Sequence, residues 1–142
     1  MKNKLILILI LGFLSCKDDE MDRALSPTAP INDPFNKTTA TAIKSGMFMN
    51  SAHTVTGTAT LYESDGKYYI TLEPFMTDNG PDLKIYLSED AKASKYLKLG
   101  ELKSTNGKQT YDVPSGTNVS SYKYLLVWCE QFSVNFGYAE LN

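Results

Sequence analysis

Apolar and polar residues alternate with a period of two through most of the sequence from residue 43 to residue 142. The pattern is clearest in HTVTGTATLY, where threonines separate Val55, Gly57, Ala59 and Leu61. Successive side chains of a β-strand point to opposite faces of a sheet, so this pattern predicts a strand with one buried face. No ten-residue stretch of this region shows the 3.6-residue period of an amphipathic helix. The region is therefore predicted to be all-β.

Turn sequences separate the predicted strands. ESDGK places Asp65-Gly66 at the tip of a hairpin, because both residues tolerate positive φ. LGELKSTNGKQTYDV predicts a second hairpin around Asn106-Gly107. LKIYLS alternates, with two leucines and an isoleucine set against lysine, tyrosine and serine. Short strands connected in this way predict one antiparallel β-sandwich or barrel over residues 43–142.

The last two predicted strands differ from the others. In the run from Tyr124 to Cys129 both alternating faces are apolar, which predicts a central strand covered on both sides. Beyond Gly137 the inward positions shift by one residue, which predicts a β-bulge at that glycine. Cys129 shares a face with Leu125 and is therefore expected inside the core or at its rim.

The N-terminal residues 1–15 have the features of a signal peptide. Lys2 and Lys4 precede the apolar run from Leu5 to Leu14, which as a helix would be about half the thickness of a bilayer core. The run ends in FLSC, which resembles the lipobox of bacterial lipoproteins, whose cysteine receives diacylglycerol. We therefore expect Cys16 to be lipidated; the alternative is an ordinary secretory signal that contains a cysteine.

The residues after Cys16 bear on localisation. Lys17, Asp18 and Asp19 resemble the export signal of some Gram-negative lipoproteins, which directs them to the outer face of the outer membrane. The alternative is the acidic start of a solvated linker. We expect an outer-membrane lipoprotein, exposed on the cell surface and held there by its acyl chains, because two or more chains are needed for stable anchoring.

Residues 16–42 are predicted to be a disordered linker between the anchor and the domain. The segment is rich in Pro, Thr, Asp and Asn, a composition that buries too little apolar surface to offset the entropy lost on ordering. Of the 14 basic residues of the chain, Lys2 and Lys4 lie in the leader, so 12 remain against 16 acidic residues. The charges are scattered and form no basic stripe, which excludes a nucleic-acid partner by this criterion.

Four sequence blocks resemble the DM-thirteen domain, also called the electron-transfer DM domain. They are GMFMNSAHTVTGTATLY, NGPDLKIYLS, LGELKSTNGKQTYDVP and YLLVWCEQFSVNFGYAEL, and they occur in the order typical of that family. The resemblance covers residues 43–142 and implies a β-rich extracellular domain. It also implies that Cys129 is a redox thiol or a ligand for a group such as haem.

His53, the only histidine, is a candidate helper for Cys129. If the fold brings the two together, His53 can activate the thiol or complete a mixed haem ligand set. The alternatives are structural: a buried cysteine commonly packs as a small hydrophobe, and a single histidine commonly ends a strand through a hydrogen bond. The acidic and polar residues that follow Cys129 do not favour a thiolate.

Metal and enzymatic sites find little support in the sequence. One cysteine and one histidine in the domain are too few for a structural zinc site, and TDNGPDL lacks the length and the closing glutamate of a calcium loop. No phosphate loop, nucleophile elbow or glycosidase-like carboxylate pair is present. The rival to redox chemistry is therefore a non-catalytic adhesion or binding module, in which tyrosines such as Tyr62, Tyr68, Tyr69 and Tyr86 meet a glycan or a protein. No motif in the sequence identifies the ligand or the electron partner.

Overall fold

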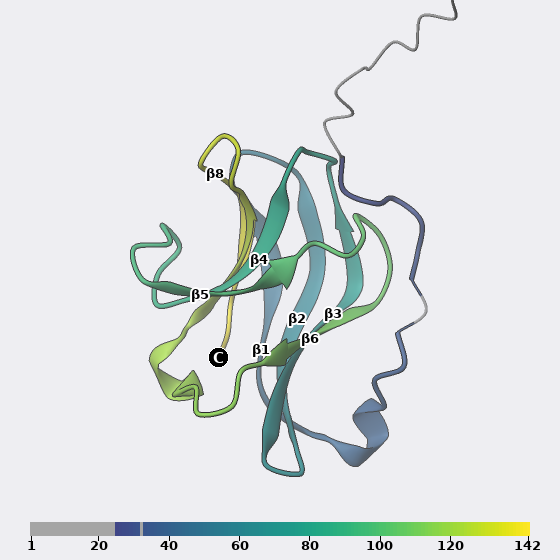
Figure 1. Ribbon diagram of the computed structural model, residues 1–142, viewed down its shortest axis with the longest axis vertical. Helices are drawn as coiled ribbons and strands as arrows, with labels where there is room; N and C mark the ends of the chain where they lie inside the picture. The colour runs from purple at the N-terminus through teal and green to yellow at the C-terminus, as the bar shows by residue number, and fades with distance from the viewer. Residues whose placement is uncertain (1–24, 32) are drawn as a thin grey trace, which may run out of the picture.

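The computed structural model describes residues 25–31 and 33–142 (Figure 1). The predictions for the signal peptide, for Cys16 and for Lys17, Asp18 and Asp19 lie outside these residues. The described chain forms eight strands and two short 3₁₀ helices: η1 (Lys37–Thr39), β1 (Thr41–Asn50), β2 (Val55–Ser64), β3 (Lys67–Thr77), β4 (Leu83–Ser88), β5 (Tyr96–Glu101), β6 (Gln109–Val113), η2 (Val119–Ser121), β7 (Tyr124–Cys129) and β8 (Val134–Glu140). In this part of the chain no helix is long and apolar enough to cross a membrane.

All strand pairs are antiparallel, and the strand order is β5-β4-β7-β8-β1-β2-β3-β6. The first part of β1 pairs with β2, and its end, from Phe48 to Asn50, pairs with β8. Strand β1 therefore connects the two layers, and the edge strands β5 and β6 approach each other to leave a nearly closed barrel (Figure 1). This confirms the predicted all-β sandwich or barrel.

The core lies between the two layers and is made of the inward faces of the strands. Val55, Ala59 and Leu61 are buried on β2, as their alternation with threonine predicts. Strand β7 pairs with β4 on one side and with β8 on the other, which confirms that it is central. The register of β8 shifts between Asn135 and Gly137, which confirms the predicted bulge.

The two predicted turns have different outcomes. Asp65 and Gly66, both with positive φ, join β2 to β3 in a tight hairpin, as predicted. The hairpin predicted around Asn106-Gly107 is wrong, because the strands on either side do not pair: β5 pairs with β4, and β6 pairs with β3. The connection instead crosses from one edge of the barrel to the other, and along it Thr77 N donates to Thr105 O.

Residues 25–31 and 33–40 lie along the domain beside β3 and β6, which corrects the linker prediction for these parts of residues 16–42 (Figure 1). Thr105 N donates to Pro27 O, and Ser104 Oγ donates to Ala29 O. The ring of Phe35 packs against Tyr62 and Tyr69 with centroid distances of 5.5 and 5.0 Å. Backbone hydrogen bonds and one aromatic anchor compensate for the low apolar content of this segment.

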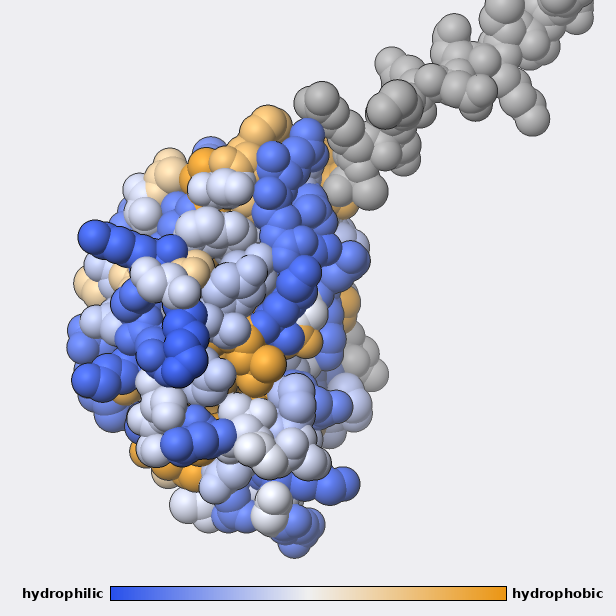
Figure 2. Space-filling view, turned by 60° about the vertical axis from the view of Figure 1, so that its left-hand side comes forward, coloured by the Kyte–Doolittle hydropathy of each residue, from blue (hydrophilic) through white to orange (hydrophobic). Residues whose placement is uncertain are grey.

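Strand β4 is buried on both faces, although its alternation suggests one exposed face. Its outer side chains are Lys84, Tyr86 and Ser88, and all three are buried. The connection between β4 and β5 folds over this face, where Asn135 Nδ2 donates to the carbonyl of Ala91. On the side of the molecule seen in Figure 2 the surface is mostly hydrophilic, and its apolar residues form small separate patches.

Candidate functional site

Cys129 is the last residue of β7, opposite Leu83 of β4 and Val134 of β8. Its side chain is 0% exposed and belongs to the main hydrophobic core, which confirms the expected burial. The alternation of β7 explains this position, since Leu125 and Val127 precede it on the same inward face. The thiol is therefore separated from solvent by the turn that leads into β4.

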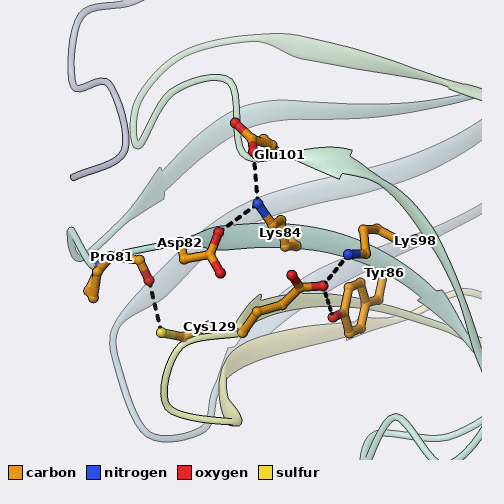
Figure 3. Close-up of polar contacts among 8 residues, drawn as sticks. Pro81, Asp82, Lys84, Tyr86, Lys98, Glu101 and Cys129 are labelled. Atoms are coloured by element: carbon orange, nitrogen blue, oxygen red, sulfur yellow. Dashed lines mark hydrogen bonds and ion pairs between the residues drawn. The ribbon is translucent and has the colours of Figure 1, made fainter. Parts of the chain in front are cut away.

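The thiol has one hydrogen-bond partner in the described chain, the carbonyl oxygen of Pro81, to which Sγ donates at 3.0 Å (Figure 3). The turn around Pro81 is held in place from both sides. The amide of Glu130 donates to Asp82 O, and Asp82 has a φ of 60°. Gly80 lies so close to the ring of Phe136 that a Cβ there would be 2.6 Å from Cζ.

His53 lies outside the core. Its ring stacks on Phe136 with a centroid distance of 3.8 Å, and its Nδ1 is 3.6 Å from Asp78 Oδ2. The ring of Phe136 in turn faces Gly80, next to the residue that accepts the hydrogen bond of Cys129. The structure thus brings His53 and Cys129 to the same end of the barrel, but no hydrogen bond joins these two described residues.

This geometry does not fit haem ligation by Cys129. An axial thiolate ligand needs an open face at sulfur, and the Sγ atom is enclosed in the core. The nearby pocket of about 410 Å³ is lined by Pro81 and Asp82, and neither Cys129 nor His53 lines it. We therefore derive no chemistry through haem.

A charged network lies beside this turn on the outer face of β4. The ammonium of Lys84 is 2.6 Å from Asp82 Oδ1 and 2.9 Å from Glu101 Oε1 (Figure 3). Burial lowers the pKa of Lys84, but the hydrogen bonds to the two carboxylates outweigh burial and raise it above the ordinary value. Lys84 therefore remains charged, and it connects the turn before β4 to the end of β5.

A second network joins Tyr86, Glu130 and Lys98. Tyr86 Oη donates to Glu130 Oε1 at 2.5 Å, and Lys98 Nζ lies 2.5 Å from the same oxygen (Figure 3). The hydrogen bonds from Lys98 and Tyr86 hold the pKa of Glu130 below its ordinary value. Burial, followed by the hydrogen bond to Glu130, raises the pKa of Tyr86. The pair is thus a phenol and an ionised carboxylate at neutral pH.

Three aromatic rings stack over this network. The rings of Tyr86 and Tyr96 are nearly parallel, with centroids 4.1 Å apart, and the ring of Trp128 lies 5.9 Å from Tyr86 at an interplanar angle of 17°. Tyr86 is 2% exposed, whereas Tyr96 is 46% exposed. The stack therefore runs from the surface to Trp128, the residue that precedes Cys129.

The sequence did not single out Lys84, Tyr86, Tyr96, Lys98 or Glu130 as one site. The closest signal in the sequence was the alternation of lysine, tyrosine and serine along β4, which lies between two turns. Because this alternation suggested an exposed face, it did not indicate a buried network. Tyr86 was predicted to be one of the tyrosines of a binding surface, and this is wrong because its side chain is buried. Tyr62 and Tyr69 pack on Phe35 and are only partly exposed.

The loop Thr77–Leu83 does not gather its oxygens around one point. Asp78 Oδ2 accepts from Thr54 N, Asn79 Oδ1 accepts from Gly80 N, and Asp82 contacts Lys84. Within residues 25–31 and 33–142, no three His, Cys, Asp or Glu side chains lie close enough together to hold a metal ion.

Comparison with known protein families gives a match over most of the described domain. Residues 47–141 match the family model described as "Electron transfer DM13". The match covers β2 to β8 and the end of β1, and it includes Cys129 and the residues of the aromatic stack. Neither the curated proteins nor the solved structures contain a significant match to the chain.

Proposed function

The chain belongs to the electron transfer DM13 family, and on this premise we propose that it is a lipid-anchored electron-transfer protein in which a one-electron route ends at Cys129. The family relationship supports electron transfer for the domain as a whole. The assignment of Cys129 as the group that changes oxidation state is our proposal.

The observation that carries the proposal is the stack of Tyr96, Tyr86 and Trp128. Rings in contact provide overlapping π-systems, and this stack extends from a half-exposed tyrosine to the residue bonded to Cys129. A partner that docks over Tyr96 can exchange electrons with the interior without reaching the thiol itself.

The burial of Cys129 selects this kind of chemistry over direct thiol reactions. Disulfide exchange and peroxide oxidation both require an attacking group to reach sulfur, and the side chain is 0% exposed. In the one-electron step, the oxidant gains an electron, and Cys129 loses an electron and its thiol proton. The proton points at Pro81 O, and Pro81 also lines the pocket of about 410 Å³, so the proton is released to solvent on this side of the domain. His53 can act only as an indirect helper, through Phe136.

The anchor belongs to the same proposal. Lipidation of Cys16, together with export directed by Lys17, Asp18 and Asp19, places the domain on the outer membrane and exposes it at the cell surface. There a soluble or membrane-bound redox partner can reach Tyr96.

The proposal is tested by flash oxidation of the detergent-solubilised protein with photogenerated tris(bipyridine)ruthenium(III), followed by counting of thiols after unfolding. We expect the Cys129 thiol to be lost on oxidation, with Cys129→Ala as the baseline, and to be lost several-fold less in Trp128→Leu. Tyr124→Phe, on the same sheet but outside the stack, should behave as the wild type. An undiminished thiol count after oxidation of the aromatic residues contradicts the route to Cys129.

A second candidate function, as a ligand-binding module, is favoured by one observation. Two buried oxygens, Asp33 Oδ2 and Thr110 Oγ1, have no hydrogen-bond partner among the described residues. Both residues line a pocket of about 290 Å³, which also contains Phe35 and Tyr69. Unpaired oxygens beside aromatic rings suit a sugar-sized polyol, because its hydroxyls donate to the oxygens and its C–H face stacks on a ring.

Titration with a panel of neutral monosaccharides, followed by calorimetry, tests this second candidate. Thr110→Val should weaken binding by tenfold or more, whereas Thr117→Val, away from the pocket, should leave it unchanged. Lack of binding at millimolar sugar, or equal binding by both variants, contradicts it.

A further inference from the structure

The hydrogen bond between Tyr86 and Glu130 lies inside the aromatic stack and has no role in the route to Cys129 described so far. We propose that Tyr86 and Glu130 form a proton-coupled redox site, in which Tyr86 gives one electron to an oxidant at the surface and its phenolic proton to the carboxylate of Glu130. The products are a neutral tyrosyl radical, a neutral carboxylic acid and the one-electron-reduced oxidant. A one-electron reductant reverses the step, and the proton returns to Tyr86.

The proton acceptor is already in position. Oη and Oε1 are 2.5 Å apart, so the proton moves along an existing hydrogen bond without any rearrangement of the site. Tyr86 is 2% exposed, and no water can readily take the proton from it. Loss of the electron alone would leave a positive charge on a buried ring, which is costly unless that charge is paired or neutralised.

Lys98 determines where the new charge resides. Before the step the ammonium of Lys98 and the carboxylate of Glu130 balance each other at 2.5 Å. After the step Glu130 is neutral, and the unbalanced positive charge lies on Lys98, whose side chain is 47% exposed and can be hydrated. The oxidation thus transfers its charge from the buried ring to a hydrated ammonium.

The other charged groups on this face do not compete for the proton. Lys84 is paired with Asp82 and Glu101, at 2.6 and 2.9 Å. These carboxylates contact Lys84, whereas the phenol of Tyr86 donates to Glu130. Glu130 is therefore the one base in the described chain to which Tyr86 is hydrogen-bonded.

The electron has a separate path from the proton. Tyr96 stacks on Tyr86 at 4.1 Å and is half-exposed, so an oxidant at the surface reaches Tyr86 through a single intervening ring. Tyr124 and Tyr138 lie on the same sheet and form a T-shaped pair with centroids 6.0 Å apart. Neither hydroxyl of that pair is hydrogen-bonded to a described carboxylate, which makes Tyr124 a matched control.

The test is flash oxidation of the full-length protein with photogenerated tris(bipyridine)ruthenium(III), followed by freeze-quench electron paramagnetic resonance. We expect a tyrosyl radical in the wild type, a loss of at least tenfold in Tyr86→Phe, and no change in Tyr124→Phe. Glu130→Gln keeps a hydrogen-bond acceptor but cannot take the proton, so radical formation should be slower and should lose its solvent deuterium isotope effect. An undiminished radical in Tyr86→Phe, or an unchanged rate and isotope effect in Glu130→Gln, overturns the proposal.

Two variants separate a failure of this proposal from a failure to fold and from a failure of the route to Cys129. Glu130→Gln retains all three rings of the stack, so it remains decisive even where Tyr86→Phe fails to fold. The proposal extends the electron route but does not need Cys129, and the variant Cys129→Ala separates the two. In that variant the Tyr86 radical should still form and should last longer; an unchanged lifetime contradicts the route to the thiol and leaves the Tyr86–Glu130 site intact.

Discussion

The thiol of Cys129 donates a hydrogen bond to the carbonyl oxygen of Pro81, 48 residues earlier in the chain, at a distance of 3.0 Å. This bond ties the end of β7 to the turn that begins β4. The ring of Phe136 packs against Gly80 in the same turn, and the ring of His53 stacks on Phe136. The position of Cys129 is thus maintained by tertiary contacts from three separate segments.

The first prediction concerns the accessibility and the packing of this thiol. Because the side chain is 0% exposed, iodoacetamide should alkylate it only after the domain unfolds, as mass spectrometry can follow in increasing urea. Cys129→Ala should lower the free energy of unfolding by about 1–2 kcal/mol, through lost packing and the lost hydrogen bond. Rapid alkylation of the folded protein, with Cys129→Ala as the control for other sites, would contradict the buried position.

The second prediction compares two glycines. Gly57 has a φ of 114°, and a Cβ there would lie 1.7 Å from the carbonyl oxygen of Pro74. Gly57→Ala should therefore cost about 3 kcal/mol or more in the free energy of unfolding. Gly116 also has a positive φ, of 81°, but a Cβ there meets open space, so Gly116→Ala should cost about 1 kcal/mol. Urea unfolding followed by the fluorescence of Trp128 measures both, and equal costs would refute the steric reason.

The third prediction concerns Lys84 and its two carboxylates. Lys84→Met should cost less than about 1 kcal/mol, because the carboxylates that remain are partly or largely exposed to water. The double variant Asp82→Asn with Glu101→Gln leaves an ammonium whose side chain is only 9% exposed, and it should cost about 2–3 kcal/mol. Chemical denaturation of both variants decides the matter, and a larger cost for Lys84→Met would reverse the assignment of the buried charge.

The fourth prediction is a pH dependence that arises from Glu130. Its pKa is below the ordinary value of 4.5, chiefly because Lys98 and then Tyr86 are hydrogen-bonded to it. The unfolded chain therefore binds this proton at a higher pH than the folded chain does. The stability that Glu130 contributes is complete above about pH 4.5 and falls as the pH drops through the lower pKa of Glu130 in the folded chain. The stability difference between wild type and Glu130→Gln should shrink from about pH 6 to about pH 3. Thermal melts across this range measure it, and a constant difference would exclude the linkage.

The fifth prediction concerns the anchor. Cys16→Ala should release the protein from membranes or leave its precursor uncleaved, as fractionation and immunoblotting can detect. Replacement of Lys17, Asp18 and Asp19 by alanine should keep the lipid but stop cleavage by protease added to intact cells. If this triple variant is cleaved as before, the export signal is refuted, while the lipid anchor stands on the Cys16 result.

Local features of the fold could be predicted because each rests on residues close together in the chain. Asp65-Gly66 makes a tight hairpin since both residues accept positive φ, and Gly137 marks a bulge because the inward positions shift there. The apolar residues on both faces of β7 require partners on both sides, which makes the strand central. Burial of Cys129 follows from the same alternation.

Pairing between distant strands was less predictable. Asn106-Gly107 has the sequence of a hairpin turn, but hydrogen bonds to β3 and β4 compete with a local hairpin, and the non-local pairs prevail. Residues 16–42 have the composition of a linker, yet the carbonyl groups of Pro27 and Ala29 accept hydrogen bonds from Thr105 and Ser104. No local property of either segment indicates which partner is available.

The sequence by itself determined the all-β class, the inward faces of strands such as β2 and β7, and the family, because a period of two and the order of short motifs are properties of the chain alone. Only the tertiary structure decided which outward side chains meet. Tyr86, Tyr96, Trp128 and Glu130 come from three strands and a turn, and they form one site because the order β5-β4-β7 places their outer faces side by side. Such contacts depend on which strands pair, and strand pairing is settled by the free energy of the whole barrel rather than by any one segment.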